Sequence, residues 1–274
     1  LIADIHFDHK LAIKCINNGI NALRLNPGNI GKREYVEKVV TLAKQQQIPI
    51  RIGVNAGSLE KNLLDKEIPL SEKMVLSALG HIKILEDLDF DLIKVSLKSS
   101  DVLTTIEAYR AISEKIDYPL HLGVTEAGTL RGGLIKSSVG LGTLLAEGIG
   151  DTIRVSLTEN PIEEVSAGLD ILKSLNLRQR GVNFISCPTC GRTQIDLIGL
   201  AKKVEEKFKN FDKPITIATM GCAVNGPGEA RHADFGIAGG VNEGIIFKKG
   251  EIIAKVPENQ LLEKLEEIIT KSYE

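Results

Sequence analysis

The sequence predicts an α/β fold: a TIM-type (β/α) barrel, with six of its eight βα units in this chain, followed by a small α+β domain. Three observations support this prediction. Short runs rich in Val, Ile and Leu alternate with helix-like segments over much of the chain, polar residues stand where these runs end, and the alternation stops near Arg180. We therefore expect a substrate-binding barrel domain at residues 1–180 and a second domain at residues 181–274.

Six apolar runs have the length and composition of strands in a parallel sheet. Near-continuous apolar strands suit a sheet that is covered on both faces, and strands that alternate with helices pair in parallel through right-handed crossovers. The runs are Leu1 to Ile5, Ala22 to Leu25, Ile48 to Val54, Leu92 to Leu97, Leu120 to Val124 and Thr152 to Leu157. Between them we expect helices such as Lys32 to Gln46 and Ser71 to Asp87, the second with Ser71 as its N-cap.

The ends of these strands favour a barrel over an open doubly wound sheet, although the open sheet remains an alternative. In a barrel the carboxyl ends of all strands converge on one mouth, whereas an open sheet gathers ligands mainly at a switch point. All six runs end in polar residues: Asp4 and His6, Arg24 and Asn26, Arg51 and Asn55, Lys94 and Ser96, His121 and Glu126, Arg154 and Ser156. Because Leu1 opens directly on a strand, we expect the two remaining βα units upstream of it.

Beyond Arg180 the pattern becomes that of a small α+β domain. A Cys-rich strand-like segment comes first, and a charged helix, a strand, a hairpin-like stretch and an amphipathic closing helix follow it. We expect these four elements at Thr193 to Asn210, Ile215 to Ala218, Gly236 to Val256 and Glu258 to Ser272.

Composition places the chain among ordinary folded proteins. Its 274 residues are 43% hydrophobic and 26% charged, close to the averages of globular domains. No apolar run approaches the roughly 20 residues of a membrane helix, and the first residues do not form a signal-peptide core. We therefore expect a cytoplasmic protein without a membrane partner. The formal net charge of −2 offers no field for nucleic acid, so an anionic ligand must be held by individually placed basic groups.

Three of the four cysteines lie in the last third of the chain, which without a secretory signal favours metal binding or catalysis over disulfides. Cys187 and Cys190 form a Cys-x-x-Cys pair, and a Gly-Pro-Gly turn between Cys222 and Glu229 can fold both toward the same site. Three thiolates and one carboxylate suit a 4Fe-4S cluster, whose carboxylate corner is the more easily displaced. A zinc knuckle with Glu229 as a surface residue stays open. Cys15 is expected to be a small buried hydrophobe.

Five long motifs span the chain: ADIHFD at Ala3 to Asp8, LRLNPGNIG at Leu23 to Gly31, RIGVNAGSLE at Arg51 to Glu60, ISCPTCGRT at Ile185 to Thr193, and GCAVNGPGEA at Gly221 to Ala230. In sequence and order they resemble the 4-hydroxy-3-methylbut-2-enyl diphosphate synthase family of the methylerythritol phosphate isoprenoid pathway, in its short bacterial two-domain form. The difference lies at the start, where the resemblance implies roughly two further βα units.

This resemblance implies a 4Fe-4S cluster held by Cys187, Cys190, Cys222 and Glu229. It also implies an oxidoreductase that converts 2-C-methyl-D-erythritol 2,4-cyclodiphosphate to (E)-4-hydroxy-3-methylbut-2-enyl diphosphate by reductive ring opening and loss of water. Flavodoxin or ferredoxin would supply the two electrons. The family works as homodimers in which one subunit's cluster domain closes over the other's barrel, so a single chain would lack a complete active site.

A cyclic diphosphate needs cations and hydrogen-bond donors. We expect them at the strand ends, from Arg24, Asn26, Arg51, Asn55, Lys94, Ser96 and His121. The catalytic candidates are Asp4, His6, Glu126 and Glu229. The first three stand at the mouth, where they could orient the substrate hydroxyl or supply a proton, although a structural hydrogen bond is an equal alternative for each. We expect the freed substrate oxygen to displace Glu229, and Arg192 to tune the potential of the cluster.

Two other classes of protein stay open. One is a zinc-stabilised barrel protein whose C-terminal module binds a partner without redox chemistry. The other is a non-redox barrel lyase or aldolase in which Lys94 forms a Schiff base. Radical chemistry with S-adenosylmethionine is disfavoured, because the Cys-x-x-x-Cys-x-x-Cys spacing that resemblance to those enzymes requires is absent.

Overall fold

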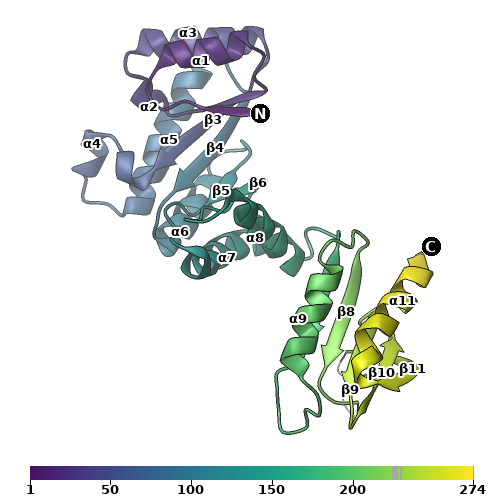
Figure 1. Cartoon of the computed structure of the whole chain (residues 1–274). Helices are drawn as coiled ribbons and strands as arrows, with labels where there is room; N and C mark the ends of the chain where they lie inside the picture. The colour runs from purple at the N-terminus through teal and green to yellow at the C-terminus, as the bar shows by residue number, and fades with distance from the viewer. Residues whose placement is uncertain (224–227, 229, 274) are drawn as a thin grey trace. The chain divides into compact units, whose positions relative to one another are not determined.

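A computed structural model of the protein describes residues 1–223, 228 and 230–273. The chain divides into two compact units, Leu1–Leu175 and Asn176–Glu274, which Figure 1 draws in purple to teal and in green to yellow. Within the described ranges, no helix is both long enough and apolar enough to cross a membrane.

Six parallel strands form the centre of the first unit. Strands β1 to β4 pair in that order, β5 pairs with β6, and a parallel bridge between Val95 and Leu120 joins the two groups. The order in space follows the order in the chain, as in a barrel, and does not reverse as it does at the switch point of a doubly wound sheet. The predicted barrel class and its six strands are confirmed: β1 (Ile2–Asp4), β2 (Ala22–Leu25), β3 (Ile50–Asn55), β4 (Ile93–Lys98), β5 (His121–Gly123) and β6 (Thr152–Arg154).

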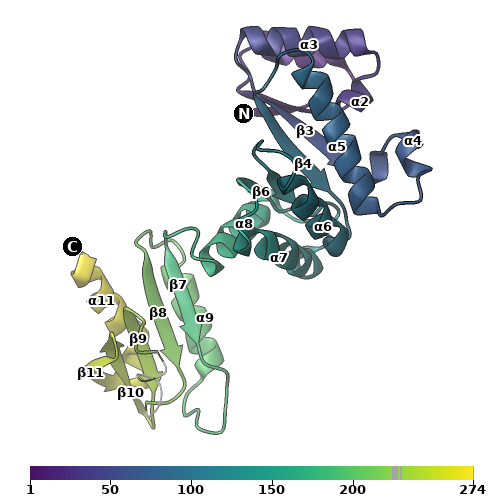
Figure 2. The ribbon, with the colours of Figure 1, turned by 180° about the vertical axis from the view of Figure 1, so that it is seen from behind.

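Helices pack against one face of these strands. Figure 2 shows α5 and α6 over β3 and β4. On β3, Ile50, Ile52 and Val54 are buried in a core that the helices share, and the alternating positions therefore face the opposite side. The long helices are α1 (His9–Asn17), α3 (Arg33–Gln45), α5 (Leu70–Glu86), α6 (Val102–Ser113), α7 (Leu130–Ala146) and α8 (Pro161–Ser174), and the short ones are α2 (Pro27–Ile30), the 3₁₀ helix η1 (Ala56–Ser58) and α4 (Lys61–Leu64).

One predicted helix start is wrong. Ser71 was expected to cap α5, but the helix begins at Leu70 with Pro69 in the cap position, and no side chain caps it. The Ser71 hydroxyl instead donates to Glu107 Oε2 on α6, at 3.0 Å. Because Pro69 lacks an N–H and fixes the extended entry, the chain starts the helix without a side-chain cap.

The second unit is a five-stranded sheet in the order β11-β10-β9-β8-β7. Strands β7 (Val182–Ser186), β8 (Ile215–Met220) and β9 (Phe235–Gly239) are parallel, and β10 (Glu243–Lys248) and β11 (Glu251–Pro257) complete an antiparallel hairpin. Helices α9 (Leu197–Phe208) and α11 (Leu261–Tyr273) share a core with one face of this sheet, and the 3₁₀ helix η2 (Glu258–Gln260) precedes α11. The predicted charged helix starts later than expected, at Leu197, because Asp196 Oδ1 accepts a capping hydrogen bond from Gly199 N.

Candidate active site

A row of charged side chains crosses the first four strands of the barrel. The strand register places Asp4 beside Arg24, Arg24 beside Arg51, and Arg51 beside Lys94. Arg24 Nη1 lies 3.0 Å from Asp4 Oδ1, and Nη2 donates to the Gly53 carbonyl at 3.4 Å. A Cβ atom at Gly53 would collide with this guanidinium, so glycine there keeps the space for Arg24. The backbone pairing of the strands therefore fixes the row.

Lys98 is the most deeply buried cation of this group, with 7% of its surface exposed. Burial, together with the positive charges of Arg154, Arg51 and Arg24, lowers the pKa of Lys98 to about 7. Burial and the neighbouring Arg24 also lower the pKa of Arg51, whose Nε is buried without a hydrogen-bond partner in the described part of the chain. Positive charges crowded in this way, against one nearby carboxylate, have the chemistry to attract a multiply charged anion.

His121 stands beside these cations as a neutral imidazole. Burial first, and then the charges of Arg51 and Lys98, lower the pKa of His121 to about 3. Its Nδ1 lies 2.9 Å from Thr152 Oγ1, and its Nε2 is buried without a hydrogen-bond partner among the described residues. The Tyr109 hydroxyl holds the strand by donating to the His121 carbonyl at 2.5 Å. Near neutral pH, His121 can offer a hydrogen bond but cannot act as an imidazolium acid.

A cavity of about 340 Å³ opens where β3, β4 and β5 end. Asn55, Ser99, Thr125 and Glu126 are among its lining residues. Glu126 has a φ of 52°, a left-handed conformation that costs free energy in a residue other than glycine. Glu126 adopts this conformation just after β5. Asn55, at the end of β3, and Glu126 both line the same cavity.

The other predicted barrel residues have different surroundings. Asp4 and His6 lie 3.6 Å apart with more than half of each side chain exposed. Asn26 is buried, and its Oδ1 accepts from Gly28 N to cap α2. Ser96 is also buried and donates to the Ile52 carbonyl. The side chains of Asn26 and Ser96 thus form hydrogen bonds with backbone groups in this structure.

Lys98 and Arg154 were not among the substrate ligands predicted from the sequence. Lys98 could have been found, because it follows Lys94 and Ser96 at alternate positions of one strand and therefore faces the same side. The register places Arg154 beside Gly123, and the Lys98 stem passes 3.5 Å from the position of a Cβ atom at Gly123. Lys98 and Arg154 belong to strands that are far apart in sequence, so only the structure shows that they are close.

The cysteines of the second unit stand at the carboxyl ends of β7 and β8. Cys187 and Cys222 are half-buried and Cys190 is exposed; none is in a disulfide. The Cys187 Sγ accepts a hydrogen bond from Gly221 N at 3.1 Å, and Gln194 N donates to the Gly221 carbonyl at 3.2 Å. The Cys-x-x-Cys loop is therefore fastened to the residue that precedes Cys222.

Hydrogen bonds from the backbone and side chain of Arg192 lower the pKa of the Cys190 thiol. Within the described ranges, however, no three His, Cys, Asp or Glu side chains lie close enough to hold one metal ion. Glu229, the expected fourth ligand, and Asn225 of the same motif lie outside the described residues. A set of cysteines in which the pKa of Cys190 is lowered and the Cys187 sulfur accepts an N–H hydrogen bond nevertheless fits an iron-sulfur group. Cys15, by contrast, packs half-buried against the barrel core, as expected.

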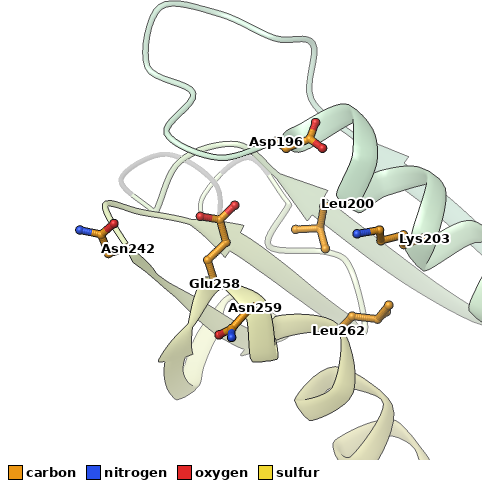
Figure 3. Close-up of a pocket in the computed structure, with 7 residues that line it drawn as sticks. All are labelled: Asp196, Leu200, Lys203, Asn242, Glu258, Asn259 and Leu262. Atoms are coloured by element: carbon orange, nitrogen blue, oxygen red, sulfur yellow. The ribbon is translucent and has the colours of Figure 1, made fainter.

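A separate hollow on the second unit has no cysteine among its described lining residues. It measures about 450 Å³ and lies between α9, the turn after β9, and the start of α11 (Figure 3). Asp196, Lys203 and Glu258 give it mixed charge, and no predicted site residue lines it. The candidate site residues therefore fall into two groups, one at the barrel mouth and one on the cysteine loops.

Fold and site together define a class: a barrel enzyme with an anion-binding mouth and a second, cysteine-bearing α+β domain. The GcpE TIM-barrel domain family matches residues 1–169, and the GcpE protein C-terminal domain family matches residues 183–271. The chain belongs to the GcpE family.

Relatives that carry the name "4-hydroxy-3-methylbut-2-en-1-yl diphosphate synthase (flavodoxin)" are similar over nearly the whole chain. The protein from Geobacter sulfurreducens is 60% identical, with 100% of this chain and 79% of the relative covered. That from Clostridium perfringens is 63% identical, with 98% and 77% covered. That from Clostridium acetobutylicum is 61% identical, with 97% and 76% covered. The predicted resemblance is confirmed, and the chain is an enzyme of this family.

Proposed function

We propose that this enzyme opens and dehydrates 2-C-methyl-D-erythritol 2,4-cyclodiphosphate reductively to (E)-4-hydroxy-3-methylbut-2-enyl diphosphate in isoprenoid biosynthesis. The observation that carries the proposal is the cation group at the strand ends, in which Lys98 is buried among arginines with its pKa lowered to about 7. Such a group is costly unless an anion of high charge binds there. The names of the relatives support the product.

The cations of the barrel mouth bind the diphosphate. Arg24, Arg51 and Lys94 retain the role expected of them, and we add Lys98 and Arg154 on the strength of their proximity. Guanidinium groups match phosphate oxygens with paired N–H donors, and the buried ammonium adds a point charge. Hydrogen bonds to the hydroxyl groups come from His121 and Asn55, and Asn26 and Ser96 contribute by holding the adjoining backbone.

Proton transfer does not fall to His121, because its pKa of about 3 leaves the imidazole neutral at physiological pH. Glu126, at the rim of the cavity, is the candidate donor to the departing oxygen. Asp4 and His6 are the alternatives at the end of β1, where their exposure leaves them free to meet a substrate hydroxyl.

Cys187, Cys190 and Cys222, with Glu229 as the fourth ligand, would hold the 4Fe-4S cluster. When bound, the cluster would pass the two electrons that the reaction consumes to the substrate one at a time. The chain's own contribution is to lower the pKa of the Cys190 thiol, through hydrogen bonds from Arg192, and to hold the Cys187 sulfur with a hydrogen bond from Gly221 N. We further propose flavodoxin or ferredoxin as electron donor, a homodimer that shares the active site between subunits, and a cytoplasmic location.

Anaerobic turnover of the cyclic diphosphate with a chemical reductant tests this function. We expect a brown protein that contains iron and sulfide and forms the hydroxymethylbutenyl product. A colourless protein with one zinc ion and no turnover would favour the zinc-stabilised binding module. Borohydride trapping of a carbonyl substrate on Lys94 would favour the lyase, and neither result is compatible with the proposal.

A further inference from the structure

Three polar side chains, two of them buried and the third, Glu60, partly exposed, form a cluster beside the barrel mouth, outside the set described above. Ser77 and His81 lie one turn apart on α5, and both are almost fully buried. Glu60 comes from the loop after β3, where it precedes α4. Its Oε1 accepts a hydrogen bond from the Ser77 hydroxyl at 3.1 Å and lies 2.9 Å from His81 Nε2.

The imidazole of His81 also touches the loop after β2. A Cβ atom at Gly28 would lie 2.9 Å from His81 Cε1 and 3.3 Å from Asn26 Oδ1. Only glycine allows this close approach between α2 and α5. Asn26 caps the same short helix. His81 therefore lies where the loops after β2 and β3 meet. Its Cε1 atom packs against the first turn of α2, and its Nε2 atom faces the carboxylate of Glu60.

This cluster is poorly arranged for stability alone. Glu60 Oε2 is buried without a hydrogen-bond partner in the described ranges, and the contact of His81 Nε2 with Glu60 is not aligned as a hydrogen bond. Burial lowers the pKa of His81 by more than Glu60 raises it. Because a half-satisfied polar cluster costs free energy that an apolar core of the same shape would not, stability gives no reason for these residue types.

We propose that Glu60, Ser77 and His81 act as positioning residues for the substrate. They join the loops that follow β2 and β3, and so fix Asn26 at the end of one strand and Asn55, five residues before Glu60, at the end of the next. Neither Glu60 nor His81 belongs to the cation group at the mouth. The inference rests on the proposed function, since it assumes that these strand ends bind the diphosphate.

Glu60→Gln is the principal test, because it preserves the acceptor for Ser77 and removes the charge that faces His81. We expect the dissociation constants for inorganic pyrophosphate and for the cyclic diphosphate to rise about tenfold, since small displacements of positioning groups have effects of that size or larger. Ser77→Ala should act in the same direction. Ser71→Ala is the matched control: it removes a buried serine of α5 that also donates to a glutamate, Glu107, at a helix-to-helix contact.

A structural role and a positioning role give different results. If Ser77→Ala and Ser71→Ala lower the melting temperature alike and neither changes anion binding, the positioning role is wrong. Gly28→Ala provides a second route that leaves the cluster's own residues intact: its Cβ would lie 2.9 Å from His81 Cε1, and it should displace the α2 turn and weaken binding. Unchanged pyrophosphate binding in Gly28→Ala contradicts the positioning role of this contact.

Failure of the proposed function is recognised separately. If the unmodified enzyme binds pyrophosphate but neither binds nor turns over the cyclic diphosphate, the proposed substrate is wrong, while a tenfold loss of pyrophosphate binding in Glu60→Gln still supports positioning. If the unmodified enzyme turns over the cyclic diphosphate and Glu60→Gln has unchanged KM and kcat, the function stands and the positioning inference fails.

Discussion

The barrel mouth and the cysteine end of the second unit present their functional groups in different ways. At the mouth, Arg24, Arg51 and Lys94 stand on neighbouring strands whose parallel register fixes their spacing. At the cysteine end, Cys187, Cys190 and Cys222 stand on loops after β7 and β8, and four hydrogen bonds at Gly221 and Thr193 fasten those loops. Sheet pairing fixes the proposed anion site in advance, whereas the proposed thiol site depends on a few local hydrogen bonds and on the group that it would bind.

The largest effect is expected from a cysteine substitution, which should abolish the iron-sulfur site and leave pyrophosphate binding unchanged. Cys187→Ser removes one thiolate, and we expect loss of bound iron and sulfide and a fall in turnover of at least about 10³-fold, because the electron path is lost while the barrel stays folded. Inorganic pyrophosphate should bind as before. Iron and sulfide assays with calorimetry measure both. Cys15→Ser is the control, since Cys15 packs half-buried on the barrel core; loss of iron in that variant would contradict the assignment.

A substitution at the barrel mouth should have the opposite pattern, with weaker pyrophosphate binding and unchanged iron content. Lys98→Met keeps the length of the buried stem and removes the ammonium, and we expect pyrophosphate affinity to fall by about 10- to 100-fold, the range for hydrogen bonds to charged groups. Iron content should not change. Lys14→Met, on the outer helix α1, controls for the loss of one charge. Equal weakening by both substitutions would mean that net charge, and not the mouth, governs binding.

The pH dependence of pyrophosphate binding should report the protonation of Lys98. The pKa of Lys98 is lowered to about 7, so the free enzyme loses its proton as the pH rises through 7, and the cationic form that attracts an anion becomes rarer. Binding raises that pKa again. We therefore expect proton uptake on pyrophosphate binding at pH 8, and an affinity that falls by about tenfold between pH 6 and pH 9.

Calorimetry in buffers of different ionisation enthalpy measures the uptake, and the Lys98→Met variant subtracts the protonation of pyrophosphate itself. His121 adds nothing to this titration, because its pKa of about 3 lies below the range. Identical proton uptake in both proteins would show that Lys98 does not titrate on binding.

Predictability from the sequence also differs between the two regions. The six strands and the polar residues that end them follow from apolar runs and strand periodicity, which are local properties of the chain. Lys98 has the same periodicity signal as Lys94, but its burial among arginines of three other strands is a tertiary property. The cysteine spacing indicates a metal site, but it does not indicate that Gly221 would bind both ends of the Cys-x-x-Cys loop. The cluster of Glu60, Ser77 and His81 could not be predicted, since Glu60 lies 17 residues before Ser77 on a different element and its contact with α5 is a tertiary property.

The smallest effect concerns the loop bonds themselves. The Thr193 hydroxyl accepts from Cys190 N at 3.1 Å, and its Oγ1 would lie 2.9 Å from a Cβ atom at Gly221. Thr193→Val retains the shape and removes this acceptor. A net hydrogen bond contributes about 0.5–1.5 kcal/mol, so we expect iron to be released to a chelator about two- to tenfold faster, with pyrophosphate binding unchanged. Thr216→Val, on the paired strand β8 and away from the cysteine loops, is the control. If Thr193→Val releases iron no faster than this control, the loops do not depend on these bonds, and the contrast between a strand-built and a loop-built site loses its physical basis.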